Sequence, residues 1–292
     1  MKEKITFGII GGDMRQAKLA QLLEADGHAV HIFGFDRQPE LVSSQSVNTL
    51  QQAASADCVV LPLPVTDEHE NLNAPISGGV IRIADVLDAM PQGQIVCGGR
   101  IPEEIFRMAS ERKLRLTDYF AREELAIANA VPTAEGVLQI AMEELPITLA
   151  GSRVLVMGFG HTGKIIAHRL HALGALVTVS ARRYSDLAWI RAYGYRQEFT
   201  EALDGRLGGY DLIVNTVPHK ILNEARLQEL SPGCLCIDIA SRPGGLDFDA
   251  ASRLGVKAIW ALSLPGKVAP VTSGAIIKET IYHILQELGV IQ

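Results

Sequence analysis

Short apolar runs recur along the chain, and segments with apolar residues at helical spacing separate most of them. Continuous apolar strands that alternate with helices are typical of parallel sheets covered on both faces. In the first part of the chain the expected strands lie at 5–10, 28–35, 58–64, 94–99 and 114–119. In the second part they lie at 153–158, 176–181, 211–216, 234–239 and 257–262. The pattern therefore predicts two doubly wound α/β domains with parallel sheets, of the Rossmann-like class.

Two amphipathic segments are predicted to connect these domains. One helix is expected over 132–145, beginning at Pro132, and a second over 274–289, beginning at Ser273 or Gly274 and ending at Gly289. These helices predict a first domain over 1–130 and a second domain over 131–272. Helix 274–289 is expected to pack back on the first domain. Two crossing linker helices would leave a cleft between the sheets, where we expect the active site.

Composition and charge narrow the classes of function. The 292 residues are 48% hydrophobic and 21% charged, and the net charge is −6, so no basic surface is expected for nucleic acid or for an acidic membrane. The chain enters a strand directly, and no apolar run reaches the ~20 residues of a membrane span, which predicts a cytoplasmic protein. The four cysteines show no metal-ligand spacing, so we expect no metal site.

The second of two glycine-rich turns has the spacing of a dinucleotide site. Gly158, Gly160 and Gly163 match G-x-G-x-x-G between a predicted strand and a predicted helix. Such glycines allow a tight turn, the approach of a pyrophosphate, and close packing of helix on strand, while the helix N-terminus stabilises the phosphate charge. Predicted contacts with the cofactor within this turn come from Gly158, Phe159, Gly160, His161, Thr162 and Gly163, with His161 lining the pyrophosphate.

The next predicted strand ends in Ser180, Ala181, Arg182 and Arg183, without the carboxylate that would bind the ribose 2′-hydroxyl of NAD. Two guanidinium groups can pair with a 2′-phosphate, and Ser180 can donate a hydrogen bond to it. The sequence therefore favours NADP over NAD. The alternative is that both arginines are simply solvated at a strand end.

The first glycine turn, Gly11 and Gly12, is followed by Asp13, whose charge would repel a pyrophosphate. Asp13 and Gln16 have the spacing of a capping box instead. Arg15, in the first turn of the predicted helix, suits a small carboxylate, so Asp13, Arg15 and Gln16 are predicted to bind substrate. A plain surface position for Arg15 is the alternative.

Four segments together resemble the dipicolinate synthase A-subunit family of spore-forming bacteria: GGDMRQ at 11–16, DYFAREELAIANAVPTAEG at 118–136, GFGHTGK at 158–164 and LPGKVAPVTSGAII at 264–277. The resemblance covers nearly the whole chain. It implies a pyridine-nucleotide-dependent oxidation of a dihydrodipicolinate-type ring to pyridine-2,6-dicarboxylate. It also implies a role in sporulation, with a flavoprotein-like chain as the second subunit, and we expect a homo-oligomer.

The second half is also similar to the nucleotide domain of 2-hydroxyacid and alanine dehydrogenases, which leaves a 2-hydroxy or 2-amino acid dehydrogenase as an alternative. Arg242 in DIASRPGG matches an arginine of the hydroxyacid enzymes, but SLPGKVAP lacks the histidine expected there. A polypeptide that binds NADP without catalysis is a further alternative, because a cofactor turn shows only binding.

A dicarboxylate ring needs two anion sites and one base. Besides Arg15, the residues predicted to bind the carboxylates are Thr66, Ser77, Gly78, Gly79 and Arg100. Asn215, Thr216, Val217 and Pro218 lie at the end of a predicted strand, where contacts with the nicotinamide ribose are expected. His219 comes next and is a candidate base, with an exposed loop position as the alternative; Lys267 and Glu135 are rival bases.

Overall fold

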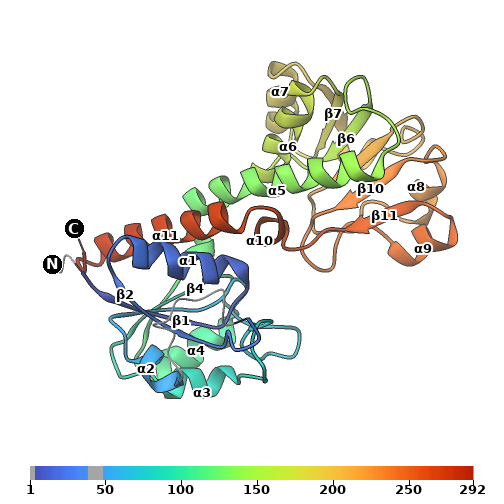
Figure 1. The fold of residues 1–292 in the computed structure, drawn as a ribbon. Helices are drawn as coiled ribbons and strands as arrows, with labels where there is room; N and C mark the ends of the chain where they lie inside the picture. Colours follow the sequence, from blue (N-terminus) through green and yellow to red (C-terminus); the bar gives the residue numbers. More distant parts are fainter. Residues whose placement is uncertain (1–3, 39–48, 292) are drawn as a thin grey trace. The chain divides into compact units, whose positions relative to one another are not determined.

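The structure is a computed structural model that describes residues 4–38 and 49–291. The chain forms two compact units: residues 1–129 with 269–292, and residues 130–268. Each unit contains one parallel β-sheet with helices packed on it (Figure 1). The predicted class, two Rossmann-like α/β domains with parallel sheets, is confirmed.

The first unit has a five-stranded sheet in the order β2-β1-β3-β4-β5. Its strands are β1 (Thr6–Ile10), β2 (Ala29–Phe33), β3 (Cys58–Val60), β4 (Ile95–Gly98) and β5 (Arg115–Asp118). Its helices are α1 (Met14–Ala25), α2 (Leu50–Ala54), α3 (Ile83–Asp88), α4 (Glu103–Glu111) and α11 (Pro270–Glu287), with a short 3-10 helix at Tyr119–Ala121. All strand pairs are parallel, so the carboxyl ends of the strands meet at one edge of the sheet.

The second unit has a six-stranded sheet in the order β11-β10-β9-β6-β7-β8. Its strands are β6 (Arg153–Met157), β7 (Leu176–Ala181), β8 (Arg196–Phe199), β9 (Leu212–Asn215), β10 (Leu235–Asp238) and β11 (Lys257–Trp260). Its helices are α6 (His161–Ala172), α7 (Tyr184–Ala192), α8 (Glu224–Gln228), α9 (Phe248–Arg253) and α10 (Leu264–Val268), with a 3-10 helix at Thr200–Ala202. The strand order reverses at β6, where ligands of such sheets bind beyond the strand ends.

Helix α5 (Glu123–Glu144) begins nine residues before the predicted start at Pro132, which lies inside it. Residues 123–131 are mostly good helix formers, which favours this earlier start. Glu123 and Glu124 stabilise the first turn because they lie at the positive end of the helix dipole. Leu125 is buried, so the early part of the helix also packs against the protein. By length and composition α5 could cross a membrane, but Ala134, Val137 and other α5 residues pack in the core of the second unit. Packing thus accounts for the apolar character of its second part.

Helix α11 also begins earlier than predicted, at Pro270 in place of Ser273 or Gly274, and ends at Glu287. Proline suits the first turn of a helix because the missing N–H has no partner there. Gly274 lies where α11 crosses α1: a Cβ at this position would be 2.9 Å from the Leu19 amide nitrogen. The two helices lie side by side in Figure 1. Asp26 links them by accepting from Lys278 Nζ at 2.5 Å and from the Tyr282 hydroxyl at 2.8 Å.

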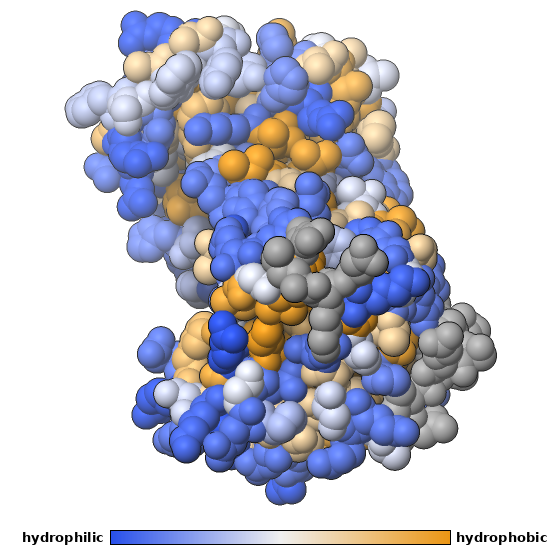
Figure 2. Space-filling view, turned by 90° about the vertical axis from the view of Figure 1, so that its left-hand side faces the viewer, coloured by the Kyte–Doolittle hydropathy of each residue, from blue (hydrophilic) through white to orange (hydrophobic). Residues whose placement is uncertain are grey.

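Hydrophilic residues cover much of the face shown in Figure 2, with smaller groups of apolar residues among them. The described residues include no group of three or more His, Cys, Asp or Glu side chains that could hold a metal ion.

Candidate functional site

The glycine turn at Gly158–Gly163 joins β6 to α6 in the second unit. Gly158 has a φ of +99°, and a Cβ there would overlap Thr216 Oγ1, while a Cβ at Gly163 would overlap the Gly158 carbonyl oxygen. A Cβ at Gly160 would meet nothing within 4 Å. The first and third glycines are thus required by the turn and by packing, and the second borders open space. This arrangement fits a pyrophosphate at the N-terminus of α6.

A cavity of about 860 Å³ opens beside this turn. The sequence-predicted cofactor residues that line it are Gly158, Phe159, Gly160, Arg182, Arg183, Thr216, Val217 and Pro218, and the candidate base His219 lines it as well. Sequence reasoning missed other lining residues: Ala181, Asp186, Thr200, Glu201, Lys220, Ile221 and Arg226. Several of these belong to the segments that follow β8 and β9, a 3-10 helix and a loop, which become neighbours of the turn only when the sheet forms.

The two arginines after β7 have different surroundings. Arg183 Nε donates to Asp186 Oδ2 at 2.8 Å, and this hydrogen bond raises the pKa of the Arg183 guanidinium. The Arg182 guanidinium is exposed and forms no ion pair with any residue that the structure describes. Arg182 is therefore the freer of the two cations for a phosphate.

Two of the predicted cofactor contacts have side chains that are buried in the fold and hydrogen-bonded within the protein. Ser180 is fully buried, and its hydroxyl oxygen accepts from Thr200 Oγ1 at 3.3 Å. Asn215 is also fully buried, and its Nδ2 donates to the Val217 carbonyl at 2.9 Å and to Asp238 Oδ1 at 2.8 Å. Neither residue lines the cavity. The sequence alone cannot tell which residues at a strand end point into the protein.

Asp238, at the end of β10, is a residue that sequence reasoning missed. Its fully buried carboxylate accepts from Asn215 and from three backbone amides, those of Ala240 at 2.9 Å, Gly245 at 2.6 Å and Leu246 at 3.2 Å. The Gly245 carbonyl in turn accepts from Ile221 N–H at 2.9 Å. Through these bonds Asp238 holds the 216–221 segment that forms one wall of the cavity. Its only signal in the sequence was its place at the end of a strand.

The remaining predictions for this unit have mixed outcomes. His161 and Thr162 open α6, but they are not among the residues that line the cavity. The predicted bases are not brought together, since only His219 lines the cavity. Lys267 is exposed on α10, and Glu135 is exposed on α5, with its Oε1 3.5 Å from Arg169 Nη2.

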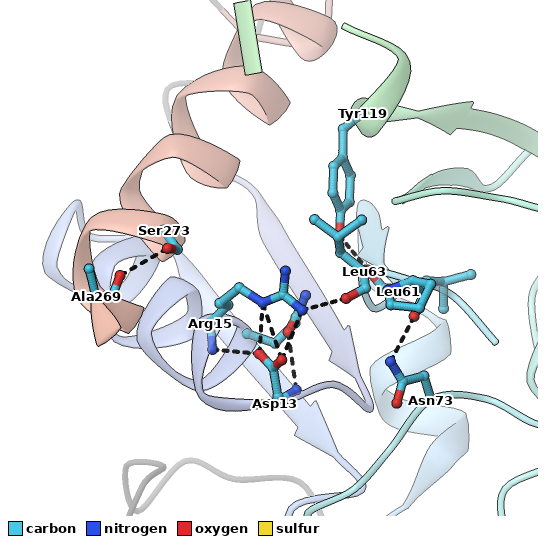
Figure 3. Close-up of polar contacts among 10 residues, drawn as sticks. Asp13, Arg15, Leu61, Leu63, Asn73, Tyr119, Ala269 and Ser273 are labelled. Carbon is cyan, nitrogen blue, oxygen red and sulfur yellow. Dashed lines mark hydrogen bonds and ion pairs between the residues drawn. The ribbon is translucent and has the colours of Figure 1, made fainter. Parts of the chain in front are cut away.

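In the first unit, the predicted capping box at the start of α1 is present. Figure 3 shows its Asp13 in contact with Arg15. Gln16 Oε1 accepts from the Asp13 N–H at 3.1 Å, and Asp13 Oδ1 accepts from the Arg15 N–H at 2.9 Å. The Arg15 side chain is 6% exposed; it forms an ion pair with Asp13 at 2.8 Å, and its Nη2 also donates to the Leu63 carbonyl. The alternative of a plain surface position for Arg15 is therefore wrong.

This geometry also argues against Asp13, Arg15 and Gln16 as substrate ligands. The Arg15 charge is already compensated by Asp13, and Gln16 is fully buried. Displacing Asp13 from Arg15 would leave a buried charge without its partner, which is costly. The three residues instead connect the start of α1 to the segment after β3.

The other predicted substrate residues lie on loops of the first unit. Thr66 is half-buried and forms an isolated bridge with Leu72. Ser77 is buried, and its hydroxyl accepts from Gly79 N–H at 3.3 Å, while Gly78 N–H donates to Asp36 Oδ2 at 2.6 Å. Arg100 is exposed at the end of β4.

A glycine turn of this geometry in a parallel α/β unit, with a cavity beside it, defines a dehydrogenase-type pyridine nucleotide-binding domain. In agreement, residues 121–250 match the model of the D-isomer specific 2-hydroxyacid dehydrogenase NAD binding domain. Residues 6–120 match the model of the N-terminal domain of the dipicolinate synthase A subunit. The chain is 33% identical over 287 residues to the A subunit of dipicolinate synthase from Bacillus subtilis, covering 97% of each chain. It belongs to the dipicolinate synthase A-subunit family.

Two solved structures of this family have the same fold. The A chain of dipicolinate synthase from Bacillus subtilis has a TM-score of 0.86 and 32% identity, over 99% of this chain and 98% of that one. The dipicolinate synthase A subunit from Bacillus halodurans has a TM-score of 0.85 and 28% identity, over 97% of both chains.

Proposed function

We propose that this chain binds NADP and oxidises a dihydrodipicolinate-type dicarboxylate to dipicolinate, as the A subunit of a dipicolinate synthase. The observation that carries the proposal is the combination of full-length similarity to the Bacillus subtilis protein of that name with a nucleotide cavity in the second unit. When bound, the nicotinamide accepts a hydride. The ring also loses one proton, and gaining aromaticity supplies much of the driving force.

The preference for NADP over NAD is supported by the residues after β7. Arg182 and Arg183 line the cavity, and no carboxylate ends that strand. Arg182 is free to pair with a 2′-phosphate, whereas Arg183 is shared with Asp186. Asp186 and Glu201 also line the cavity, so the net selectivity depends on how the two arginines are balanced by these acids.

For the proton we propose His219 as the acceptor, because it lines the nucleotide cavity while Glu135 and Lys267 do not. The His219 side chain is exposed, and its backbone N–H donates to the Val217 carbonyl at 2.8 Å. This bond fixes the turn that carries the imidazole. A neutral imidazole near the reacting ring would take the proton as the hydride leaves.

The proposal extends to partners and context. The Bacillus subtilis relative is named as one subunit of a dipicolinate synthase, which supports a second subunit, for which we propose a flavoprotein-like chain. We further propose a cytoplasmic homo-oligomer that acts in sporulation.

The experiment is a turnover assay in which nicotinamide absorbance is followed with NADP⁺ and a dihydrodipicolinate precursor, with this chain alone and with its partner. Formation of NADPH and dipicolinate in equal amounts supports the proposal. Tight NADP binding without turnover in either arm would show that the chain binds the nucleotide without catalysing the oxidation.

A second candidate is favoured by the match to the 2-hydroxyacid dehydrogenase domain: an oxidation of 2-hydroxy or 2-amino acids with Arg242 binding the carboxylate. Turnover of such acids but not of the dihydrodipicolinate precursor would favour it. The segment 263–270 that lacks a histidine argues against this chemistry.

A further inference from the structure

The carboxyl ends of the strands in the first unit carry several arginines, and two of them are already paired. Arg15 is neutralised by Asp13, and Arg122, just after the 3-10 helix, is held by Glu124 and Glu287. Among the described residues at this edge, the guanidinium groups of Arg37 and Arg100 have no ion pair or hydrogen-bond partner. Arg37 follows β2 at the border of the sheet, whereas Arg100 follows β4 inside it.

Arg100 has a backbone conformation that is unfavourable for an arginine. Its φ is +53°, in the left-handed region that glycine adopts without a steric cost. The two residues before it are glycines, and a Cβ at Gly99 would be 2.5 Å from the ring of Tyr119. A third glycine would fit the turn better than an arginine does. Strained positions of this kind cluster at functional sites, where the surrounding structure imposes them.

Asp118 is what holds this turn in place. Its Oδ1 accepts from Arg100 N–H at 2.9 Å and from Phe120 N–H at 2.7 Å, and its Oδ2 accepts from Ile101 N–H at 2.9 Å. Asp118 ends β5 and is paired in register with Gly98 of β4, so it reaches the Arg100 turn from the neighbouring strand. Its carboxylate is thus occupied by backbone amides and leaves the Arg100 guanidinium without a counter-charge.

We infer that Arg100 is a carboxylate-binding cation for the substrate and that Asp118 is the positioning residue that presents it. The contrast with Arg15 and Arg37 carries the inference: Arg15 is paired with Asp13, Arg37 lies at the border of the sheet, and Arg100, inside the sheet, combines a strained backbone with an unpaired guanidinium. A planar guanidinium binds a carboxylate through two parallel hydrogen bonds, which suits one carboxylate of a pyridine dicarboxylate. The inference rests on the proposed function.

The test uses the full chain saturated with NADPH and measures binding of pyridine-2,6-dicarboxylate and pyridine-2-carboxylate by calorimetry. Arg100→Gly is expected to bind the dicarboxylate about ten- to hundredfold more weakly, because charge-assisted hydrogen bonds are lost. Its NADPH affinity should not change, and its melting temperature should equal or exceed that of the wild type, since glycine relieves the backbone strain. Arg100→Lys should recover part of the affinity.

Two matched controls separate charge and strain from recognition. Arg37→Ala removes the same charge from the same sheet edge and should change dicarboxylate affinity by less than about twofold. Lys113→Gly relieves a left-handed residue of nearly the same φ, +58°, beyond the end of α4, and should leave binding unchanged. Equal losses for Arg37→Ala and Arg100→Gly would overturn the inference, because net charge would then explain both.

If Asp118 acts only by positioning Arg100, the effect of replacing Asp118 should depend on whether Arg100 is present. Asp118→Asn should weaken dicarboxylate binding severalfold in the wild type and have no further effect in Arg100→Gly. The preference for the dicarboxylate over pyridine-2-carboxylate should fall in both single variants, which a general loss of stability would not produce. Additive losses would overturn the positioning role of Asp118.

The outcomes also distinguish this inference from the function on which it rests. A wild-type chain that binds neither pyridine acid would refute the dipicolinate proposal and the inference with it. Wild-type binding that Arg100→Gly fully retains would refute the inference alone.

Discussion

Two alanine substitutions in the glycine turn between β6 and α6 should have separate effects, one on nucleotide binding and the other on the stability of the fold. Gly160→Ala adds a methyl group where nothing lies within 4 Å, at a residue with ordinary φ and ψ of −77° and −170°. Gly163→Ala adds the same group against the Gly158 carbonyl oxygen. The first change should therefore affect only a bound pyrophosphate, and the second should affect the fold.

The magnitudes follow from these surroundings. Overpacking against backbone costs up to ~3 kcal/mol, and alanine regains ~1 kcal/mol over glycine inside a helix, so Gly163→Ala should lose about 2 kcal/mol. This corresponds to a melting temperature lower by about 4 to 8 °C for a unit of this size. Gly160→Ala should stay within ~0.5 kcal/mol of the wild type, yet bind NADPH about ten- to hundredfold more weakly, or ~1.4 to 2.8 kcal/mol.

Thermal and urea denaturation measure the first effect, and NADPH fluorescence titration measures the second. Unchanged NADPH affinity in Gly160→Ala would refute the assignment of the open space to the cofactor. If Gly163→Ala unfolds at the same midpoint as the wild type, α6 and the end of β6 do not approach each other as closely as in the structure.

Arg182→Ala should reduce the preference for NADPH over NADH more than Arg183→Ala does, because Arg183 is already paired with Asp186. Equal affinities of the wild type for the two nucleotides would contradict the NADP proposal. Asp238→Asn should cost about 2 to 4 kcal/mol of unfolding free energy, since a buried amide group would then face backbone N–H donors, and urea denaturation showing no loss would contradict its role. The hydrogen bond from Lys278 lowers the pKa of Asp26 below 3.8, so its contribution to stability is present above that pH and is lost as the pH falls through the lowered pKa. The stability difference between wild type and Asp26→Asn should therefore shrink below about pH 4, which acid titration of unfolding measures, and a constant difference would argue against the bond.

Local sequence determined much of this protein. The alternation of apolar runs and helical segments is enough to predict two parallel α/β domains, because the pattern of each strand and helix depends on its own neighbours in the chain. The same holds for the capping box at Asp13 and Gln16 and for the turn at Gly158–Gly163, where residues a few positions apart make the contacts. The four short segments quoted above were likewise enough to identify the dipicolinate synthase A-subunit family.

What only the tertiary structure decided is which polar groups are satisfied by partners far along the chain. From the sequence, Arg15 is predicted to bind an anion, but in the fold its guanidinium donates to the carbonyl of Leu63, 48 residues away. Asn215 is predicted to contact the ribose, but its side-chain amide donates to Asp238. Arg100 has the opposite outcome, because Asp118 on the adjacent strand binds its backbone and leaves its charge available. Burying a charge or an amide requires a partner, and the order of strands in the sheet determines which partner is within reach.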